Sequence, residues 1–319
     1  MNPSWMPAPF DYLRLSVTNR CQLSCTYCRP QHHAPPRRLL SARKLVALCE
    51  AMCVVAPIRK IRLSGGEPLL RPDLVELVAG LAKLPTKPEI TLTTNGVLLE
   101  EVAEGLAAAG LSRINVHVDT ADPTAYARWT AMPALDRVLR GLAAARAAGF
   151  RHTKINAVMT SALDASAVRR LLVLAGDNEA ILRFIELMPM GLDGRAYERL
   201  FLPADLGLQR ISEAADLTRA DADASPHRRY LAALPDARRV MVEMITPMSR
   251  PFCASCSRVR LTCDGKLLPC LLSPVRMSVL GEDGSLPDLP ALGGLLHRCA
   301  SLKRRTMTGL CERMWAVGG

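Results

Sequence analysis

The sequence predicts an α/β fold built on a parallel sheet, and three observations lead to this prediction. Short runs rich in β-branched residues alternate with longer Ala- and Leu-rich runs whose apolar residues recur at i, i+3 and i+4. Six such strand–helix units follow one another before about residue 190. Hydrophobic residues make up 49% of the 319 residues, enough for a sizeable core. Repeated units of this kind form a parallel sheet, open or closed into a barrel.

The predicted elements follow in chain order. The six strands are expected at residues 12–17, 60–64, 89–93, 113–118, 154–159 and 182–187. Helices are expected at residues 42–54, 73–83, 99–109, 135–148 and 165–175. Gly110 and Gly149 come directly after two of these helices, where glycine commonly ends a helix. The pattern resembles an incomplete TIM-type (β/α)6 barrel, in which functional residues lie at the C-terminal ends of the strands.

The regular alternation fades after Met190, and this change predicts a two-part organisation. We expect residues 1–215 to form the partial barrel and residues 216–319 to form a C-terminal extension. Residues 216–229 are polar and contain Asp, Ser and Pro, which predicts a linker or a surface loop. The extension contains a second group of cysteines, so we expect it to carry a second metal centre.

Composition narrows the possible partners. The chain has 41 Lys plus Arg against 30 Asp plus Glu, and its net charge of +11 favours an anionic partner. Charge alone does not choose among nucleotide, nucleic acid and lipid, but an aromatic content of 4% argues against a single-stranded nucleic-acid binder. No apolar run reaches the roughly 20 residues that a membrane helix needs. We therefore expect a cytoplasmic protein that binds neither membrane nor nucleic acid.

The first cysteine trio is Cys21, Cys25 and Cys28, a C-x3-C-x2-C pattern just after the first predicted strand. In a chain of eleven cysteines without a visible secretory signal, such spacing indicates metal binding or redox chemistry rather than disulfides. Structural zinc sites normally close with four ligands. Three thiolates suit a four-iron cluster that leaves one iron open to an outside ligand.

The second trio is Cys253, Cys256 and Cys270, and it allows two interpretations. If Cys263 is a fourth ligand, the segment is a zinc ribbon. If it is not, the trio holds a second iron–sulfur cluster that also leaves one iron open. The remaining cysteines show no ligand spacing and are expected to be buried thiols or surface residues: Cys49, Cys53, Cys299 and Cys311.

Basic residues on predicted strands indicate an anion site. Strand alternation places Lys60, Arg62 and Ser64 on one face, and Arg258 shares a face with Arg260 if that segment is extended. Arginine guanidinium groups match phosphate oxygens bidentately, and charged groups that point into a barrel are costly unless a ligand satisfies them. The sequence contains neither a P-loop nor a GxGxxG fingerprint, so ordinary nucleotide-binding loops are not supported.

The first trio, together with Ser64-Gly65-Gly66-Glu67-Pro68 after the second strand, resembles the radical S-adenosylmethionine (SAM) superfamily. Longer strings are similar to the GTP 3′,8-cyclase family of molybdenum cofactor biosynthesis. These strings are DYLRLSVTNRC at residues 11–21, KIRLSGGEPLLR at 60–71, TTNG at 93–96, RFIELMP at 183–189 and PFCASCSRVRLT at 251–262. The terminal Gly318-Gly319 is also similar to that family.

The resemblance implies a lyase with two [4Fe-4S] clusters and S-adenosylmethionine as cofactors. The first trio would hold the cluster that binds SAM, and the second trio would hold the other cluster. The residues at SAM-contacting positions are Tyr27, Gly66, His117 and Met188. Those at GTP-contacting positions are Arg14, Arg62, Thr93, Lys154, Arg258 and Arg260. Of these, Arg258 and Arg260 are also expected to act in catalysis by stabilising a radical adduct.

The implied reaction joins the ribose of GTP to its base. A 5′-deoxyadenosyl radical would take the 3′ hydrogen of GTP, and the ribose radical would attack C8 of guanine, which gives 3′,8-cyclo-7,8-dihydro-GTP after reduction. The implied partners are GTP, a reductase or flavodoxin-type electron donor and a downstream cyclic pyranopterin monophosphate synthase, and a homodimer is compatible with the family. The C-terminal tail, with Arg313 and the two terminal glycines, is expected to insert into the barrel mouth.

Three positions depart from the family pattern. His117 stands where the family usually has Ser, Arg29 stands in place of Met, and Ser257 stands in place of Asn. A diverged paralogue that acts on another purine nucleotide by the same radical chemistry is therefore the alternative. A non-enzymatic iron–sulfur or zinc protein that binds nucleic acid is a third hypothesis, which the barrel pattern and the two trios disfavour.

Overall fold

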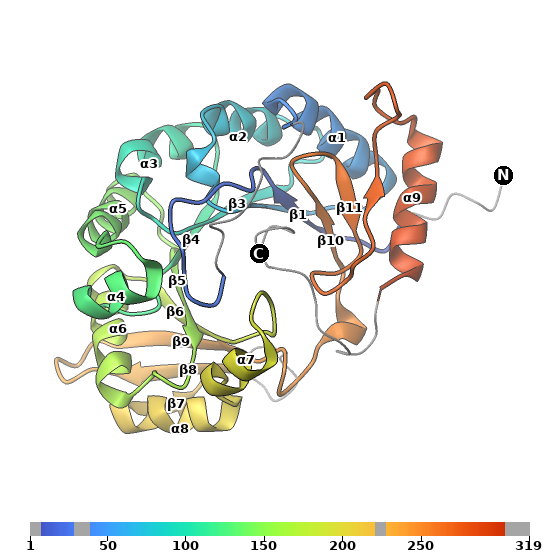
Figure 1. Ribbon diagram of the computed structural model, residues 1–319. Coiled ribbons are helices and arrows are strands. Elements are labelled where there is room, and N and C mark those ends of the chain that lie inside the picture. Colours follow the sequence, from blue (N-terminus) through green and yellow to red (C-terminus); the bar gives the residue numbers. More distant parts are fainter. Residues whose placement is uncertain (1–7, 29–38, 221–227, 304–319) are drawn as a thin grey trace.

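The computed structural model describes residues 8–28, 39–220 and 228–303, and Figure 1 shows their arrangement. A curved 12-stranded sheet, in the order β12-β11-β10-β1-β2-β3-β4-β5-β6-β9-β8-β7, forms the inner wall of the described part. Helices cover the outer, convex face of this wall (Figure 1). The apolar core lies between the two layers, where strand residues such as Leu13, Leu15, Ile61 and Leu63 are fully buried.

The six predicted strands and the five predicted helices are confirmed, with boundaries that differ by at most two residues. The strands are β1 (Tyr12–Ser16), β2 (Lys60–Ser64), β3 (Glu89–Thr94), β4 (Arg113–His117), β5 (Lys154–Met159) and β6 (Ile181–Glu186), each parallel to the next. The helices are α1 (Ala42–Val55), α2 (Leu74–Ala82), α3 (Leu99–Ala108), α5 (Leu135–Ala147) and α6 (Ala165–Asp177). Gly110 and Gly149 follow α3 and α5 with φ of +94° and +91°, the left-handed conformation that glycine adopts without strain.

The sequence did not predict the two strands that extend the parallel sheet at its ends. β10 (Arg258–Leu261) pairs parallel with β1, and β9 (Arg239–Ile245) pairs parallel with β6. Antiparallel strands continue the sheet beyond them: β11 (Lys266–Leu268) and β12 (Met277–Ser278) on one side, and β8 (Arg228–Ala233) and β7 (Asp216–Arg219) on the other. Strands from beyond residue 215 therefore complete both ends of the barrel wall.

The prediction of a linker over residues 216–229 is wrong at both ends of that segment. Its first four residues form β7 and its last two begin β8, while residues 221–227 lie outside the described part. β7 is an edge strand with mostly exposed side chains, and charged polar residues are what an exposed sheet edge carries. The polar composition of this segment therefore gave no indication that it contains a strand.

Four further helices are present in the described part. They are α4 (Pro123–Thr130), α7 (Gly194–Leu200), α8 (Ala204–Ala214) and α9 (Leu289–Ser301), with short 3₁₀ turns η1 (Pro68–Leu70) and η2 (Cys253–Ser255). Asp122, Asp193 and Asp288 cap α4, α7 and α9 by accepting a hydrogen bond from a backbone N–H of the first turn. α9 packs against α1. Among the described residues, no helix has both the length and the apolar character that a membrane crossing requires.

Candidate active site

The first cysteine trio lies on the loop that directly follows β1, at the carboxyl edge of the parallel strands. The backbone N–H of Cys28 donates to the carbonyl of Cys25 over 2.9 Å, which turns the loop back on itself. Burial, Asp119 and the neighbouring thiols of Cys28 and Cys21 raise the pKa of Cys25. The three thiols therefore influence one another electrostatically, and their role as cluster ligands stays a prediction.

The Gly65-Gly66-Glu67 loop after β2 supports the trio through its own backbone packing. A Cβ atom on Gly65 would overlap the carbonyl oxygen of Thr18, and one on Gly66 would overlap that of Arg20. The N–H of Gly66 donates to Thr18 over 2.9 Å. Glycine is thus required here to seat the loop after β2 against the cysteine loop, and a contact of Gly66 with SAM stays a prediction.

Glu67 ties this loop to the end of β3. It is fully buried and accepts hydrogen bonds from the Thr94 hydroxyl at 2.6 Å, the Asn95 N–H at 2.7 Å and the Leu69 N–H at 3.0 Å. Burial raises the pKa of Glu67 to about 7 despite these donors. The Asn95 amide also lies 3.8 Å from the Cys21 sulfur, so the buried carboxyl helps to orient a donor toward the trio.

His117, Tyr27 and Asp119 form one hydrogen-bonded group beside the first trio. The Tyr27 hydroxyl lies 2.5 Å from His117 Nε2 and donates to Asp119 Oδ2 over 2.6 Å, and His117 Nε2 lies 3.0 Å from Asp119 Oδ1. Burial lowers the pKa of His117, but the Asp119 carboxylate outweighs burial and raises it. This histidine therefore holds Tyr27 in place at a cavity of about 300 Å³ that Tyr27 and Asp119 line.

The His117 imidazole is expected to titrate above its ordinary value of about 6.5, because the Asp119 carboxylate stabilises the protonated form. The pair then stabilises the fold fully below about pH 6.5, and this stabilisation is lost as the pH rises through the higher pKa of the folded protein. NMR of histidine-labelled protein measures the titration, with His117→Asn identifying the resonance. Asp119→Asn is expected to lower the pKa, whereas Asp122→Asn, which alters another carboxylate of the same cavity, is not. Equal effects of both variants would contradict the assignment.

Basic side chains gather inside the barrel where β10, β1 and β2 lie side by side. The register places Arg14 between Arg62 and Arg260, and Tyr12 between Lys60 and Arg258. Four cationic groups lie 5.5–5.8 Å from the centre of the Tyr12 ring: those of Arg14, Lys60, Arg62 and Arg258. We call these four residues together with Arg260 the cation cluster.

The cation cluster is electrostatically unfavourable without an anion. Burial and the neighbouring arginines lower the pKa of Arg62 to about 10 and that of Arg260 to about 9. The Nε of Arg14 is buried and has no hydrogen-bond partner among the described residues. Like charges held together in a buried site are costly, so this arrangement is suited to a polyanion such as a triphosphate.

A second basic group lies across the barrel on β5, β6 and β9, and only part of it was predicted. Lys154 Nζ donates to both carboxylate oxygens of Glu243 over 2.8 Å, and Arg183 donates to the same carboxylate over 2.6 and 2.9 Å. The two cations hold the pKa of Glu243 at about 2. Arg183 also acts on Arg62, which places it toward the cation cluster, and the sequence analysis missed it.

The remaining predicted residues occupy separate places on the wall. Thr93 is half-buried on β3, where it pairs with Asn115 of β4. Strand alternation puts Thr93 on the same face as Thr91. The Thr91 hydroxyl accepts a 3.1 Å hydrogen bond from Arg62. Met188 follows β6 and packs with Met190, Leu268 and Leu272. Its contact with SAM stays a prediction.

The second trio lies at the opposite edge of the same strands. Cys253 and Cys256 precede β10, whose direction is parallel to β1, so they lie at the amino edge of the barrel. β11 runs antiparallel to β10 and returns the chain to this edge, where Cys270 follows it. Cys270 and Cys256 both act on the pKa of Cys253, which burial raises. The trio is therefore assembled by the β10–β11 hairpin.

Cys263 does not join this trio. It follows β10 and therefore lies at the other end of the hairpin, where it is buried and its carbonyl accepts a hydrogen bond from Leu40 N–H. Burial and Asp264 raise the pKa of Cys263 to about 11, and no cysteine contributes to this shift. A zinc ribbon with Cys263 as fourth ligand is thus not formed. Among the described residues, no three His, Cys, Asp or Glu side chains are arranged as a ready cage for a single metal ion.

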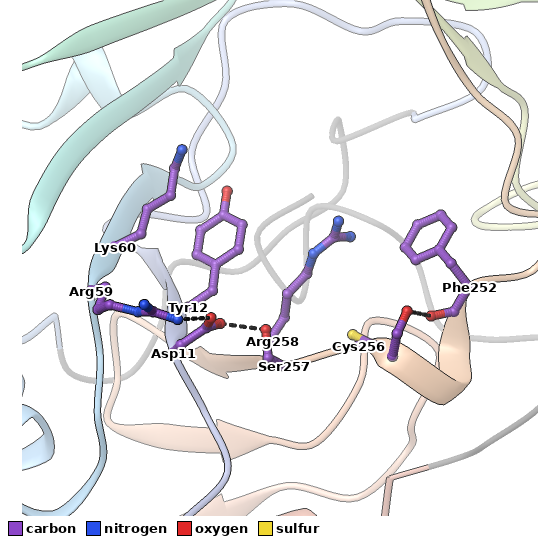
Figure 2. Close-up of a pocket in the computed structure, with 9 residues that line it drawn as sticks. Asp11, Tyr12, Arg59, Lys60, Phe252, Cys256, Ser257 and Arg258 are labelled. Carbon is purple, nitrogen blue, oxygen red and sulfur yellow. Dashed lines mark hydrogen bonds and ion pairs between the residues drawn. The ribbon is translucent and has the colours of Figure 1, made fainter. Parts of the chain in front are cut away.

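A cavity of about 330 Å³ lies beside Cys256 of the second trio and is also lined by Lys60 and Arg258 of the cation cluster (Figure 2). Cys256, Ser257 and Phe252 line it from the extension, and Figure 2 shows the side chains of Tyr12, Lys60 and Arg258 directed together into the barrel. Ser257 donates to the Asp11 carboxylate, which is also 3.3 Å from the Arg59 guanidinium. The cation cluster therefore lies between the two trios, with a space beside it for a ligand.

Comparisons with known proteins agree with this geometry. Residues 15–174 match the Radical SAM superfamily and residues 180–281 match Molybdenum Cofactor Synthesis C. A GTP 3′,8-cyclase of Pseudomonas entomophila is 41% identical over 82% of this chain and 78% of its own length. One of Rhodopirellula baltica is 36% identical over 97% of this chain and 89% of its own, and one of Peptoclostridium acidaminophilum is 38% identical over 85% and 83%.

Solved structures of low sequence identity share the fold. Native anSMEcpe with bound AdoMet superposes with a TM-score of 0.63 at 17% identity, over 90% of this chain and 81% of that one. Streptococcus suis SuiB bound to S-adenosylmethionine gives a TM-score of 0.64 at 17% identity, over 86% of this chain and 63% of SuiB. The fold, with its carboxyl-edge cysteine trio, is that of a radical SAM protein. Within that superfamily, the chain belongs to the GTP 3′,8-cyclase family.

Proposed function

We propose that this chain is a radical SAM lyase that converts GTP into 3′,8-cyclo-7,8-dihydro-GTP, the first step of molybdenum cofactor biosynthesis. One observation carries the proposal. A cluster of like-charged residues that are buried or half-buried, suited to a triphosphate, lies between two cysteine trios at opposite edges of one barrel. Membership in the GTP 3′,8-cyclase family supports the same activity.

The cofactors are two [4Fe-4S] clusters and S-adenosylmethionine, and the donor sets fit them. Each trio supplies three thiols, which hold a four-iron cluster and leave one iron for an outside ligand. Cys21, Cys25 and Cys28 would hold the first cluster with SAM, and Cys253, Cys256 and Cys270 the second. When bound, the first cluster and SAM supply the 5′-deoxyadenosyl radical that opens the reaction.

The chain's own residues bind and orient the reactants. Arg14, Arg62 and Arg260 present guanidinium groups to the triphosphate, and Lys154 reaches it by exchanging its bond to Glu243 for a phosphate oxygen. Arg258 follows Cys256 by two residues and lines the same cavity, so it is placed to stabilise charge that develops near the base. Thr93 supplies a further hydroxyl on this wall.

SAM is proposed to bind at the carboxyl edge of the barrel, opposite the second trio. Tyr27 and His117 form the wall beside the first trio, with Gly66 and Met188 on the loops that follow β2 and β6. Arg29, which also departs from the family pattern, and the C-terminal residues Arg313, Gly318 and Gly319 lie outside the described part. An insertion of the tail into the barrel therefore remains a prediction.

We further propose the cellular setting that this reaction requires. The clusters need a reductase or flavodoxin-type electron donor, and the product needs a cyclic pyranopterin monophosphate synthase to consume it. The chain is also proposed to work in the cytoplasm and to assemble as a homodimer.

A nucleotide screen tests the proposed reaction. The anaerobically reconstituted and reduced chain is incubated with SAM and one nucleotide at a time, and 5′-deoxyadenosine and nucleotide loss are followed together. We expect nucleotide-dependent turnover with GTP and none with ATP, GMP or guanosine. Turnover with ATP or a monophosphate in place of GTP would contradict the proposal and favour the diverged paralogue. The observation that supports a paralogue is Ser257, which lines the cavity where the family usually has Asn.

A further inference from the structure

Lys303 brings a positive charge to the second cysteine trio from outside the barrel. It follows the C-terminal end of α9, a helix that packs against α1. Its side chain reaches the loop before β10, where Nζ lies 3.4 Å from the sulfur of Cys256. The ammonium group also lies 5.1 Å from the centre of the Phe10 ring.

The same ammonium group fixes the backbone from Cys256 to Arg258. Nζ donates to the carbonyl oxygen of Cys256 and, over 2.7 Å, to the carbonyl oxygen of Arg258. A lysine ammonium has three donors, and these two carbonyls and the sulfur account for them. The contact therefore spans the junction between the ligand loop and β10, the strand that carries two members of the cation cluster.

The surroundings of the two trios differ in charge. The Cys21 sulfur of the first trio has a neutral amide donor, Asn95, with the buried Glu67 carboxyl close by. The Cys256 sulfur of the second trio has a cationic donor. Hydrogen bonds and positive charge near cluster sulfurs stabilise the reduced, more negative cluster and so raise its reduction potential.

We propose that Lys303 is a positioning residue for the second cluster: it holds the Cys256 loop against β10 and raises the reduction potential of the cluster that this loop ligates. The assignment rests on the second trio as a cluster site and does not depend on which nucleotide is the substrate. A more easily reduced second cluster would accept an electron more readily than the first, so the two centres would be distinguishable within one chain.

Potentiometric titration followed by EPR tests the proposal in the full-length, reconstituted chain without nucleotide. The variants are Lys303→Met, which removes the charge, and Lys303→Arg, which keeps it. Arg298→Met is the matched control, because it removes an exposed cation from the last turn of the same helix. Each variant is also measured in a Cys25→Ala background, so that the signal of the second cluster is seen without that of the first.

We expect Lys303→Met to lower the potential of the second cluster. At a fixed potential its reduced-to-oxidised ratio should fall about tenfold, which for a one-electron couple corresponds to 59 mV. Lys303→Arg should stay close to the unmodified chain, and Arg298→Met should be unchanged. The signal of the first cluster should be the same in all variants, which separates an effect on one site from a general loss of structure.

Two outcomes would overturn the proposal. In the first, Lys303→Met has the potential and EPR spectrum of the unmodified chain. In the second, Lys303→Met and Lys303→Arg both lose the second cluster and retain about four irons. The positive charge that Lys303→Arg keeps would then not be what holds the cluster. Loss of the second cluster in Lys303→Met with retention in Lys303→Arg would support the positioning role. These readouts need no turnover, so they remain valid if the nucleotide screen fails.

Discussion

Replacing Cys25 with alanine is expected to abolish both 5′-deoxyadenosine formation and GTP conversion. The first trio lies at the carboxyl edge of the barrel, and with two thiols left it no longer holds the centre that binds and reduces SAM. The second trio, at the amino edge, should remain loaded. Iron content is therefore expected to fall from about eight to about four per chain, with both activities below detection.

The matching change in the second trio separates the two roles. Cys256→Ala is also expected to retain about four irons, but SAM cleavage should persist while GTP conversion falls by at least about 100-fold, because the substrate loses its anchor near Arg258. Cys49→Ala and Cys263→Ala serve as controls, since both thiols are buried outside the trios and should leave about eight irons. Cleavage of SAM by the Cys25→Ala chain, or near-normal GTP conversion by Cys256→Ala, would contradict the assignment.

Arg14→Met is expected to weaken GTP binding about 10- to 100-fold, which corresponds to about 1.5–3 kcal/mol for one charged hydrogen-bonding group. The same change should stabilise the unliganded chain. Arg14 repels Arg62, Arg258 and Arg260, and its buried Nε lacks a hydrogen-bond partner among the described residues. A gain of about 1 kcal/mol would raise Tm by about 2 °C.

Calorimetry and thermal unfolding measure the two effects of Arg14→Met. Inorganic triphosphate should lose affinity as GTP does, whereas Arg137→Met, which removes an exposed cation paired with Glu101, should leave both affinities unchanged. Weaker binding combined with a lower Tm would show that Arg14 is a structural ion rather than a triphosphate ligand. Unchanged affinity would place the triphosphate elsewhere.

The barrel units were predictable because their signals are local. β2 and β5 begin and end at the predicted residues, since polar and apolar residues alternate over the first four residues of each strand. β10 has only four residues, too few for a clear periodicity, whereas β9 has seven mostly apolar residues and was missed although its pattern suits a strand. The pairing of β9 with β6 and of β10 with β1 joins distant parts of the chain. Long-range pairing of this kind has no signature in a sequence window.

The site was predictable where strand alternation or a motif carries it. Strand alternation correctly placed Arg62 on the same face of the sheet as Lys60, and Arg258 on the same face as Arg260. It did not reveal that Glu243 pairs with Arg183, 60 residues away, and with Lys154, 89 residues away. It also did not reveal the bond from His117 to Tyr27 across 90 residues. These contacts form only when distant strands and loops assemble around the curved sheet, so the sequence shows the residues but not the pairs.

The most direct test of the two-centre barrel is the position of iron in a crystal of the reconstituted chain, measured by anomalous diffraction at the iron edge. We predict two separate peaks, one beside Cys21, Cys25 and Cys28 at the carboxyl edge and one beside Cys253, Cys256 and Cys270 at the amino edge, with the cation cluster between them. A single iron peak, or two peaks at the same edge of the strands, would contradict this account.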